Sequence, residues 1–110
     1  FVIKIGQIVM VKHIVLFKLA SEAEGKSRAE NALIIKEMLE ALKDAIPVIR
    51  KIEVKINHSD SSADNHDIIL ESEFDSMEDV RTYAVHPEHL KVGAYITKVR
   101  TSRAAIDYEF

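Results

Sequence analysis

The chain has 110 residues, of which 47% are hydrophobic and 30% charged, and its formal net charge is -3. This length and composition predict one compact domain, and the slight acidic excess argues against a nucleic-acid binder, which needs a basic face. The sequence has no cysteine, which excludes disulfides, thiolate nucleophiles and zinc–thiolate sites and is compatible with a reducing cytoplasm.

The first nine residues are mostly apolar and are interpreted as an N-terminal extension, residues 1–9, ahead of a domain that spans residues 10–110. The extension is too short to span a bilayer and lacks the small-residue cleavage site of a signal peptide. The rest of the sequence contains no transmembrane candidate and no repeat. We therefore expect a cytoplasmic protein that makes no contact with membranes or nucleic acid.

The first half of the domain begins with a strand over residues 11–19, which are rich in β-branched and aromatic side chains and apolar on both faces. A polar connection follows, at the end of which Ser27 and Glu30 have the spacing of a helical capping box. Apolar residues then recur at helical spacing and predict an amphipathic helix over residues 28–45, stopped by Pro47.

The second half begins with a half-buried strand over residues 51–57, in which apolar and charged residues alternate. Residues 58–67 are a polar loop, and residues 68–75 form a third strand. A helix capped by Ser76 follows, with a predicted apolar stripe of Met77, Val80, Tyr83 and Ala84. After Pro87 we expect a shorter helix, and the alternating residues 104–110 predict a closing strand.

The order strand, helix, strand, strand, helix, strand is typical of an α+β, ferredoxin-like βαββαβ fold, with an antiparallel sheet and both helices on one face. The strands offer apolar side chains to the other face as well, and a large apolar face marks an interaction surface. We therefore expect a homodimer in which two sheets pack face to face as a dimeric α/β barrel.

The segment Tyr83-Ala84-Val85-His86-Pro87-Glu88-His89 gathers a phenol and two imidazoles around a proline, and these groups suit proton transfer near neutral pH. Because Pro87 fits the first turn of a helix, one helix is expected to end near His86 and the next to begin at Pro87. His89 then lies where the helix dipole keeps its imidazole neutral, as a general base beside Tyr83. The alternative interpretation is a structural kink with exposed histidines.

Metal and cofactor sites have less support in the sequence. His86 and His89 are separated by a proline and lack an accompanying carboxylate, so we predict no metal site there. His58 and His66 lie among aspartates in a segment typical of a solvated loop. The three glycines form no phosphate-binding arrangement, and we expect no cofactor.

Several segments together resemble the stress-responsive α/β-barrel (Dabb) family: Val11-Lys12-His13-Ile14-Val15-Leu16-Phe17-Lys18, Ile46-Pro47, Phe74-Asp75-Ser76, Tyr83-x-x-His86-Pro87-x-His89 and Ile106-Asp107-Tyr108. The likeness covers about residues 11–110 and implies a dimeric barrel of two ferredoxin-like protomers. The family includes plant proteins tied to stress tolerance, uncharacterised bacterial proteins and a cofactor-free plant polyketide cyclase.

The resemblance to the cyclase implies a Tyr–His site, because that enzyme uses a Tyr and a His of the motif in an intramolecular aldol condensation. Tyr83 and His89 match them in this sequence. His13, His86 and Asp107 also fall on pattern positions, whereas a further histidine of the cyclase is replaced by Ile68. Matching the motif identifies the family more securely than it identifies a reaction.

The leading functional hypothesis is a stress-associated dimeric α/β-barrel protein that binds a small apolar molecule. The first alternative is a cofactor-free, polyketide-cyclase-like enzyme with His89 as general base and Tyr83 as oxyanion donor. The second alternative is a haem-handling or monooxygenase-like dimeric barrel. The residues expected to line a substrate-binding pocket are His13, Phe17, His86 and Asp107.

Overall fold

The computed structural model of the chain describes residues 9–110. The predicted N-terminal extension therefore lies, apart from Val9, outside the described residues. The elements in chain order are β1 (Val11–Leu19), β2 (Glu22–Ala23), β3 (Lys26–Ser27), α1 (Arg28–Glu40), α2 (Leu42–Ala45), β4 (Lys51–Ile56), β5 (Ile68–Phe74), α3 (Met77–Val85), α4 (Pro87–Val99) and β6 (Arg100–Glu109).

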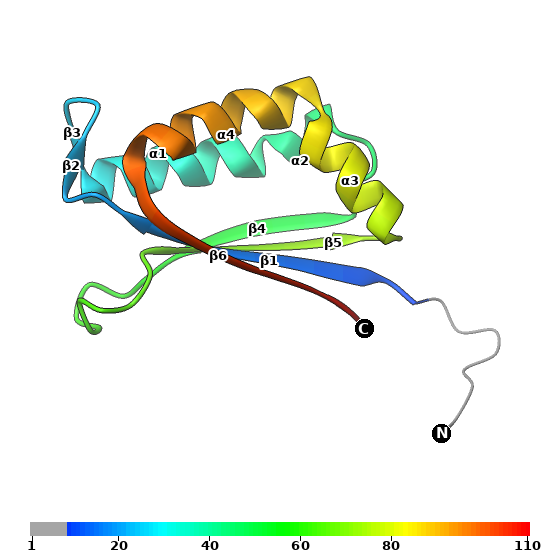
Figure 1. The fold of residues 1–110 in the computed structure, drawn as a ribbon, viewed down its shortest axis with the longest axis horizontal. Coiled ribbons are helices and arrows are strands. Elements are labelled where there is room, and N and C mark those ends of the chain that lie inside the picture. Colours follow the sequence, from blue (N-terminus) through cyan, green and yellow to red (C-terminus); the bar gives the residue numbers. More distant parts are fainter. Residues whose placement is uncertain (1–8) are drawn as a thin grey trace.

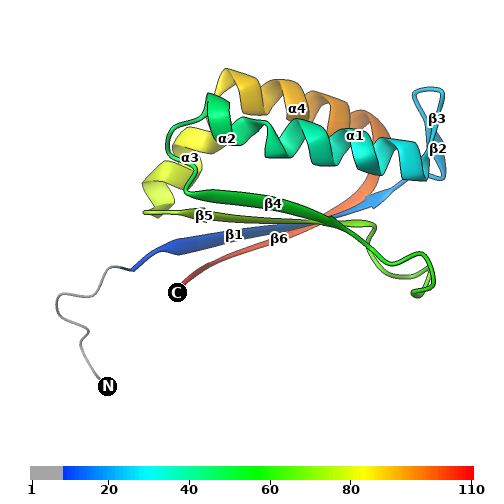
Figure 2. The same ribbon diagram turned by 180° about the vertical axis from the view of Figure 1, so that it is seen from behind.

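The long strands form one antiparallel sheet in the order β4-β5-β1-β6. Within the described residues the helices all lie on one face of this sheet, and the opposite face is left uncovered (Figure 1). The view from behind shows the same two layers (Figure 2). This is the ferredoxin-like α+β fold that the order of strands and helices predicts. No helix of residues 9–110 is long and apolar enough to cross a membrane.

The hydrophobic core lies between the sheet and the helix layer. Alternate residues of each strand point to this side, so the cross-strand neighbours Val15, Leu70 and Val54 form a buried row. Ile35 and Leu39 of α1 are buried in the same core. Full burial of one such side chain contributes about 1.5–3 kcal/mol, so this layer fixes the helices on the sheet.

The first helix begins at the predicted capping box. The Ser27 hydroxyl accepts a hydrogen bond from Glu30 N–H at 3.2 Å, and the Glu30 carboxylate accepts one from Ser27 N–H at 3.1 Å. The predicted single helix over residues 28–45 is wrong in one respect, because α1 ends at Glu40 and α2 starts after Ala41. Ala41 keeps right-handed helical backbone angles, so the interruption is local and carries no sequence signal such as a proline.

The hairpin formed by β2 and β3 replaces part of the predicted polar connection. Its turn is Glu24-Gly25, with φ angles of 52° and 71°. Positive φ at both central positions is typical of a two-residue hairpin turn, in which Asn-Gly or Asp-Gly is the usual pair. A glutamate rarely adopts this conformation, which is why the sequence pattern did not predict the hairpin.

The helices on either side of Pro87 differ from their predicted patterns. Val80 and Tyr83 of the predicted stripe are buried, whereas Met77 and Ala84 are exposed. The prediction of a shorter second helix is wrong, since α4 has 13 residues and α3 has 9. The buried residues of α4 extend to its last residue, Val99. The helix therefore packs against the core along its length and ends directly before β6.

The uncovered side of the sheet is also apolar, as the strand pattern predicts. We call it the open sheet face, and its apolar side chains come from three adjacent strands: Ile14, Leu16, Ile69, Ile106 and Tyr108. Ile106 is 59% exposed and Tyr108 is 44% exposed.

β6 begins at Arg100 rather than at Ala104, because its pairing with β1 continues to Leu19.

A buried polar contact joins the two long helices to the hairpin. Asn31 is fully buried; its amide accepts a hydrogen bond from the Tyr95 hydroxyl at 2.5 Å and donates one to the Ala23 carbonyl at 3.1 Å. Because Asn31→Ala leaves both partners unsatisfied, we expect it to lower the free energy of unfolding by about 2–3 kcal/mol. Urea unfolding at one protein concentration measures this. Asn65→Ala, in the exposed loop, is the control and should change stability by less than about 0.5 kcal/mol.

Candidate functional site

The junction between α3 and α4 places the Tyr–His segment as the sequence predicts. His86 ends α3 and caps α4, with extended backbone angles before Pro87, the first residue of α4. The His86 Nδ1 atom accepts a hydrogen bond from Glu88 N–H at 3.1 Å. His86 therefore has a defined structural use as a helix cap, and His89 follows in the first turn of α4.

Tyr83 is the centre of an aromatic cluster beneath this junction. Its ring centroid lies 4.4 Å from that of His89, 5.1 Å from that of Phe74 and 6.0 Å from that of His13. The side chain is 1% exposed, and its hydroxyl has no hydrogen-bond partner among residues 9–110. Burial raises the pKa of Tyr83, with a smaller opposing effect from the charge of Arg103. The hydroxyl is thus protonated at neutral pH and is a hydrogen-bond donor with no acceptor among the described residues.

The imidazole of His89 is held through one of its two nitrogens, and the other has no hydrogen-bond partner among residues 9–110. Its Nδ1 atom lies 2.9 Å from the Ala84 carbonyl oxygen, which can only accept, so Nδ1 carries the proton and donates. Nε2 therefore keeps a lone pair in the neutral ring. Burial lowers the pKa of His89, and electrostatic effects of His13, Arg103 and His86 act in the same direction.

The predicted neutral state of His89 agrees with this direction, but the leading cause is different. The sequence pattern predicts a neutral ring through the dipole at the start of α4, whereas desolvation of the half-buried ring is the largest contribution, opposed by the bond to Ala84. Burial of this ring depends on the packing of α3 against the sheet. The local sequence pattern therefore predicts the direction of the pKa shift of His89 but not its main cause.

A second imidazole approaches the cluster from the sheet. His13 and Asp107 are direct cross-strand neighbours in the β1–β6 pair, and His13 Nδ1 lies 2.5 Å from an Asp107 carboxylate oxygen. Both side chains point to the helix side of the sheet. Asp107 therefore orients His13 and not His89.

The structure brings together His13, Tyr83, His89 and Asp107 of the predicted site residues. Phe17 lies four residues further along β1 than His13 and is buried in the core. The aromatic ring that contacts both Tyr83 and His13 is instead Phe74, at the end of β5. Sequence reasoning also missed Arg103, although it is on the same side of β6 as Asp107 by simple alternation.

Two hollows of the described surface lie away from this cluster. The larger, of about 420 Å³, lies between the start of α1 and the polar loop, and its lining includes Arg28, His58 and Asp67. The smaller, of about 190 Å³, is lined by residues such as Leu16 and Ile69 near one end of the open sheet face. Residues 9–110 contain no group of three or more metal-ligating side chains.

Comparison with known proteins places this site in a family context. Residues 11–110 match the family described as Stress responsive A/B Barrel Domain. A dimeric protein of unknown function with a ferredoxin-like fold, from Bacteroides fragilis, is 46% identical; the match covers 92% of this chain and 96% of that chain, with a TM-score of 0.77. Among curated proteins, none matches this sequence.

More distant solved structures share the fold. A dimeric ferredoxin-like protein of unknown function from Thermobifida fusca is 22% identical over 94% of this chain and 93% of its own, with a TM-score of 0.77. The hydroxynitrile lyase of Passiflora edulis is 18% identical over 92% of this chain and 93% of its own, with a TM-score of 0.76. The family match over nearly the whole described chain is decisive: this protein belongs to the stress-responsive A/B barrel family.

Proposed function

We propose that this chain forms a homodimer through its open sheet face and binds a small, largely apolar molecule at the Tyr83–His89 cluster in each protomer. The uncovered apolar residues of β1, β5 and β6 support the dimer, since such a face is costly in water. The 46% identical Bacteroides fragilis protein is itself described as dimeric.

The observation that carries the binding proposal is the Tyr83 hydroxyl, which is buried and has no partner among the described residues. A buried donor without a partner costs about 1–3 kcal/mol, and a bound hydrogen-bond acceptor removes that cost. Burial holds the pKa of Tyr83 above its usual range, so this group donates and does not become a phenolate at neutral pH. The ligand is therefore expected to present an acceptor such as a carbonyl oxygen.

The rings packed around Tyr83 support an aromatic or apolar body for the ligand. Phe74 and the rings of His13 and His89 surround Tyr83, and aromatic rings favour tilted or edge contacts with another ring. An aromatic or similarly apolar body suits such walls. A small aryl ketone combines this body with the carbonyl that Tyr83 requires.

Acetophenone is the simplest probe of this proposal, and Tyr83→Phe is the informative variant. Without a probe, the variant is expected to be about 1 kcal/mol more stable, because the unpartnered hydroxyl is removed. It should nevertheless bind acetophenone about tenfold more weakly, because one neutral hydrogen bond is lost. Titration followed through the Tyr and His ring resonances measures the affinity, and urea unfolding measures the stability.

Tyr95→Phe is the matched control, because the Tyr95 hydroxyl is partly buried and, unlike that of Tyr83, donates a hydrogen bond to Asn31. This variant should lose stability and keep its affinity for acetophenone. A Tyr83→Phe protein that is less stable than wild type, or that binds acetophenone equally well, would contradict the proposed role of the Tyr83 hydroxyl.

A second candidate function is cofactor-free proton abstraction, which the free Nε2 of His89 favours. In the proposed step, Nε2 takes a proton from the carbon next to the carbonyl. The C–H electron pair forms a carbon–carbon double bond, and the carbonyl π pair moves to the oxygen as an enolate. Tyr83 donates a hydrogen bond to that oxygen. The lowered pKa of His89 keeps the imidazole in the neutral form that this step needs.

A further inference from the structure

Near the Tyr83–His89 cluster, α4 and β6 carry small residues with open space beside them. Gly93 follows His89 by four residues and so lies on the same flank of α4. A Cβ atom built on Gly93 would meet no heavy atom within 4 Å, so there is open space beside it. On β6, Ala105 stands two residues before Asp107 on the helix side of the sheet and is exposed.

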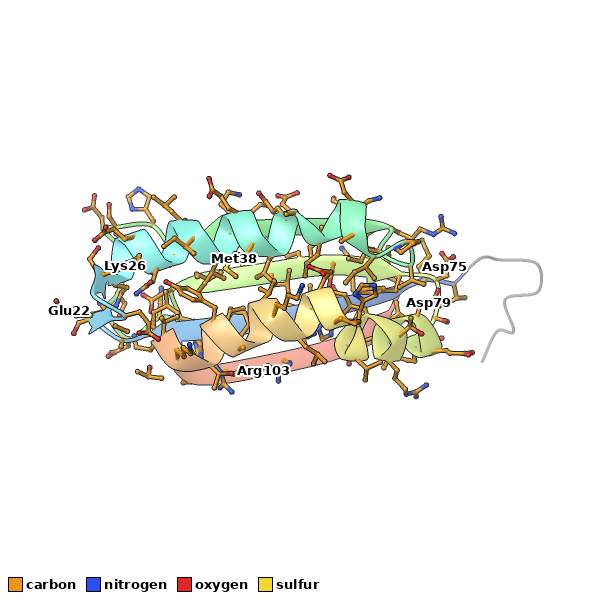
Figure 3. The ribbon with its side chains drawn as sticks, turned by 90° about the horizontal axis from the view of Figure 1, so that it is seen from above. Glu22, Lys26, Met38, Asp75, Asp79 and Arg103 are labelled. Atoms are coloured by element: carbon orange, nitrogen blue, oxygen red, sulfur yellow. The ribbon has the colours of Figure 1, made fainter. Side chains whose placement is uncertain are left out.

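Arg103 lies beyond Ala105 on this side of β6. It is the next residue of β6 to point the same way as Ala105 and Asp107, and it pairs with Phe17 of β1. Figure 3, seen from the helix side, shows Arg103 on β6 beside α4. Within residues 9–110, Arg103 forms no ion pair, and its side chain is exposed.

The positive charge of Arg103 acts on two residues of the cluster. Its positive charge lowers the pKa of Tyr83 and also that of His89. Asp107, the nearest carboxylate along this side of β6, is bonded to His13. Among residues 9–110, this region therefore combines the buried Tyr83 hydroxyl, which has no partner, with the exposed Arg103 guanidinium, which forms no ion pair.

We propose that Arg103 selects ligands that carry a carboxylate at the end opposite the carbonyl group, so that the preferred ligand is an aryl keto acid or a similar anion. The inference rests on the proposed binding at Tyr83 and extends it to a substrate class. Arg103 and Asp107 are about 13 Å apart along the strand at roughly 3.3 Å per residue. The extended Arg103 side chain covers part of this distance, and one substituted aromatic ring fits the remainder. A guanidinium pairs with a carboxylate through two parallel hydrogen bonds.

The test compares 4-acetylbenzoate with its methyl ester, which keeps the shape and removes the charge. On the wild-type protein at low salt, the carboxylate should bind about fivefold more tightly than the ester, the scale of an exposed ion pair. Arg103→Gln should abolish this difference and leave acetophenone binding unchanged. Arg81→Gln, which removes the same charge from the exposed side of α3, should keep the difference.

Removing Arg103 should also raise the pKa of His89, which histidine NMR titration measures.

The possible outcomes separate this inference from the proposed function. If acetophenone binds through Tyr83 but the carboxylate gives no advantage, or keeps its advantage in Arg103→Gln, the role of Arg103 is refuted and the binding site remains. If none of the three compounds binds or perturbs Tyr83 and His89, both proposals are refuted. A carboxylate advantage that Arg103→Gln abolishes and Arg81→Gln retains supports the inference.

Discussion

Replacing His89 by glutamine is expected to reduce protein-catalysed hydrogen–deuterium exchange at the methyl group of acetophenone by at least about a hundredfold, the usual contribution of a positioned general base. Glutamine keeps a polar side chain of similar reach but cannot take up the proton. In D2O the base removes a proton and a deuteron returns to carbon, so the methyl signal fades in a proton NMR spectrum. The rate relative to buffer measures the catalysis.

The pH dependence of this exchange follows from the state of His89. Because burial lowers its pKa, the neutral base persists below the ordinary histidine value of 6.5 and is lost only as the pH falls through the lower, folded-state pKa. The rate should therefore decline on acidification, with its midpoint below 6.5. His58→Gln makes the same chemical change in the exposed loop and should leave rate and midpoint unaltered. An exchange rate that His89→Gln leaves intact would exclude His89 as the base.

Much of this fold is predictable because its element ends carry local signals. Ser27 with Glu30 starts α1, and Pro87 separates α3 from α4, each through chemistry within a few residues. The break at Ala41 and the left-handed Glu24 have no such signal. Proline would mark a helix break, and asparagine or aspartate would mark a left-handed turn position, but neither kind of residue stands at Ala41 or Glu24.

The candidate site likewise has one part that local sequence signals predict and one part that they do not. Tyr83 and His89 belong to one segment, so their proximity follows from local helix geometry and the family resemblance. The His13–Asp107 pair depends on the register of β1 with β6, which brings together two residues that are 94 positions apart in the chain. Alternation alone puts Arg103 on the same side of β6 as Asp107, but only the register shows that this side faces the helices.

Ile106→Glu tests the proposal that the open sheet face is the dimer interface. Two-fold symmetry brings this residue into the interface twice, so each dimer loses two buried isoleucines, worth about 1.5–3 kcal/mol each, and gains two buried carboxylates. We expect the dimer dissociation constant to rise by at least about a thousandfold, since each factor of ten corresponds to about 1.4 kcal/mol. Sedimentation velocity over a range of concentrations measures the change.

Leu33→Glu is the matched control for this prediction. Leu33 is 58% exposed on α1 in the helix layer, and Ile106 is 59% exposed on the opposite side of the molecule, so both changes put the same charge in place of an equally exposed apolar side chain. If the open sheet face is the interface, only Ile106→Glu yields monomers. Dissociation by Leu33→Glu, or a dimer that survives Ile106→Glu, would place the interface elsewhere. The open sheet face would then need another cover, since apolar side chains from three strands are exposed or half-buried in the monomer.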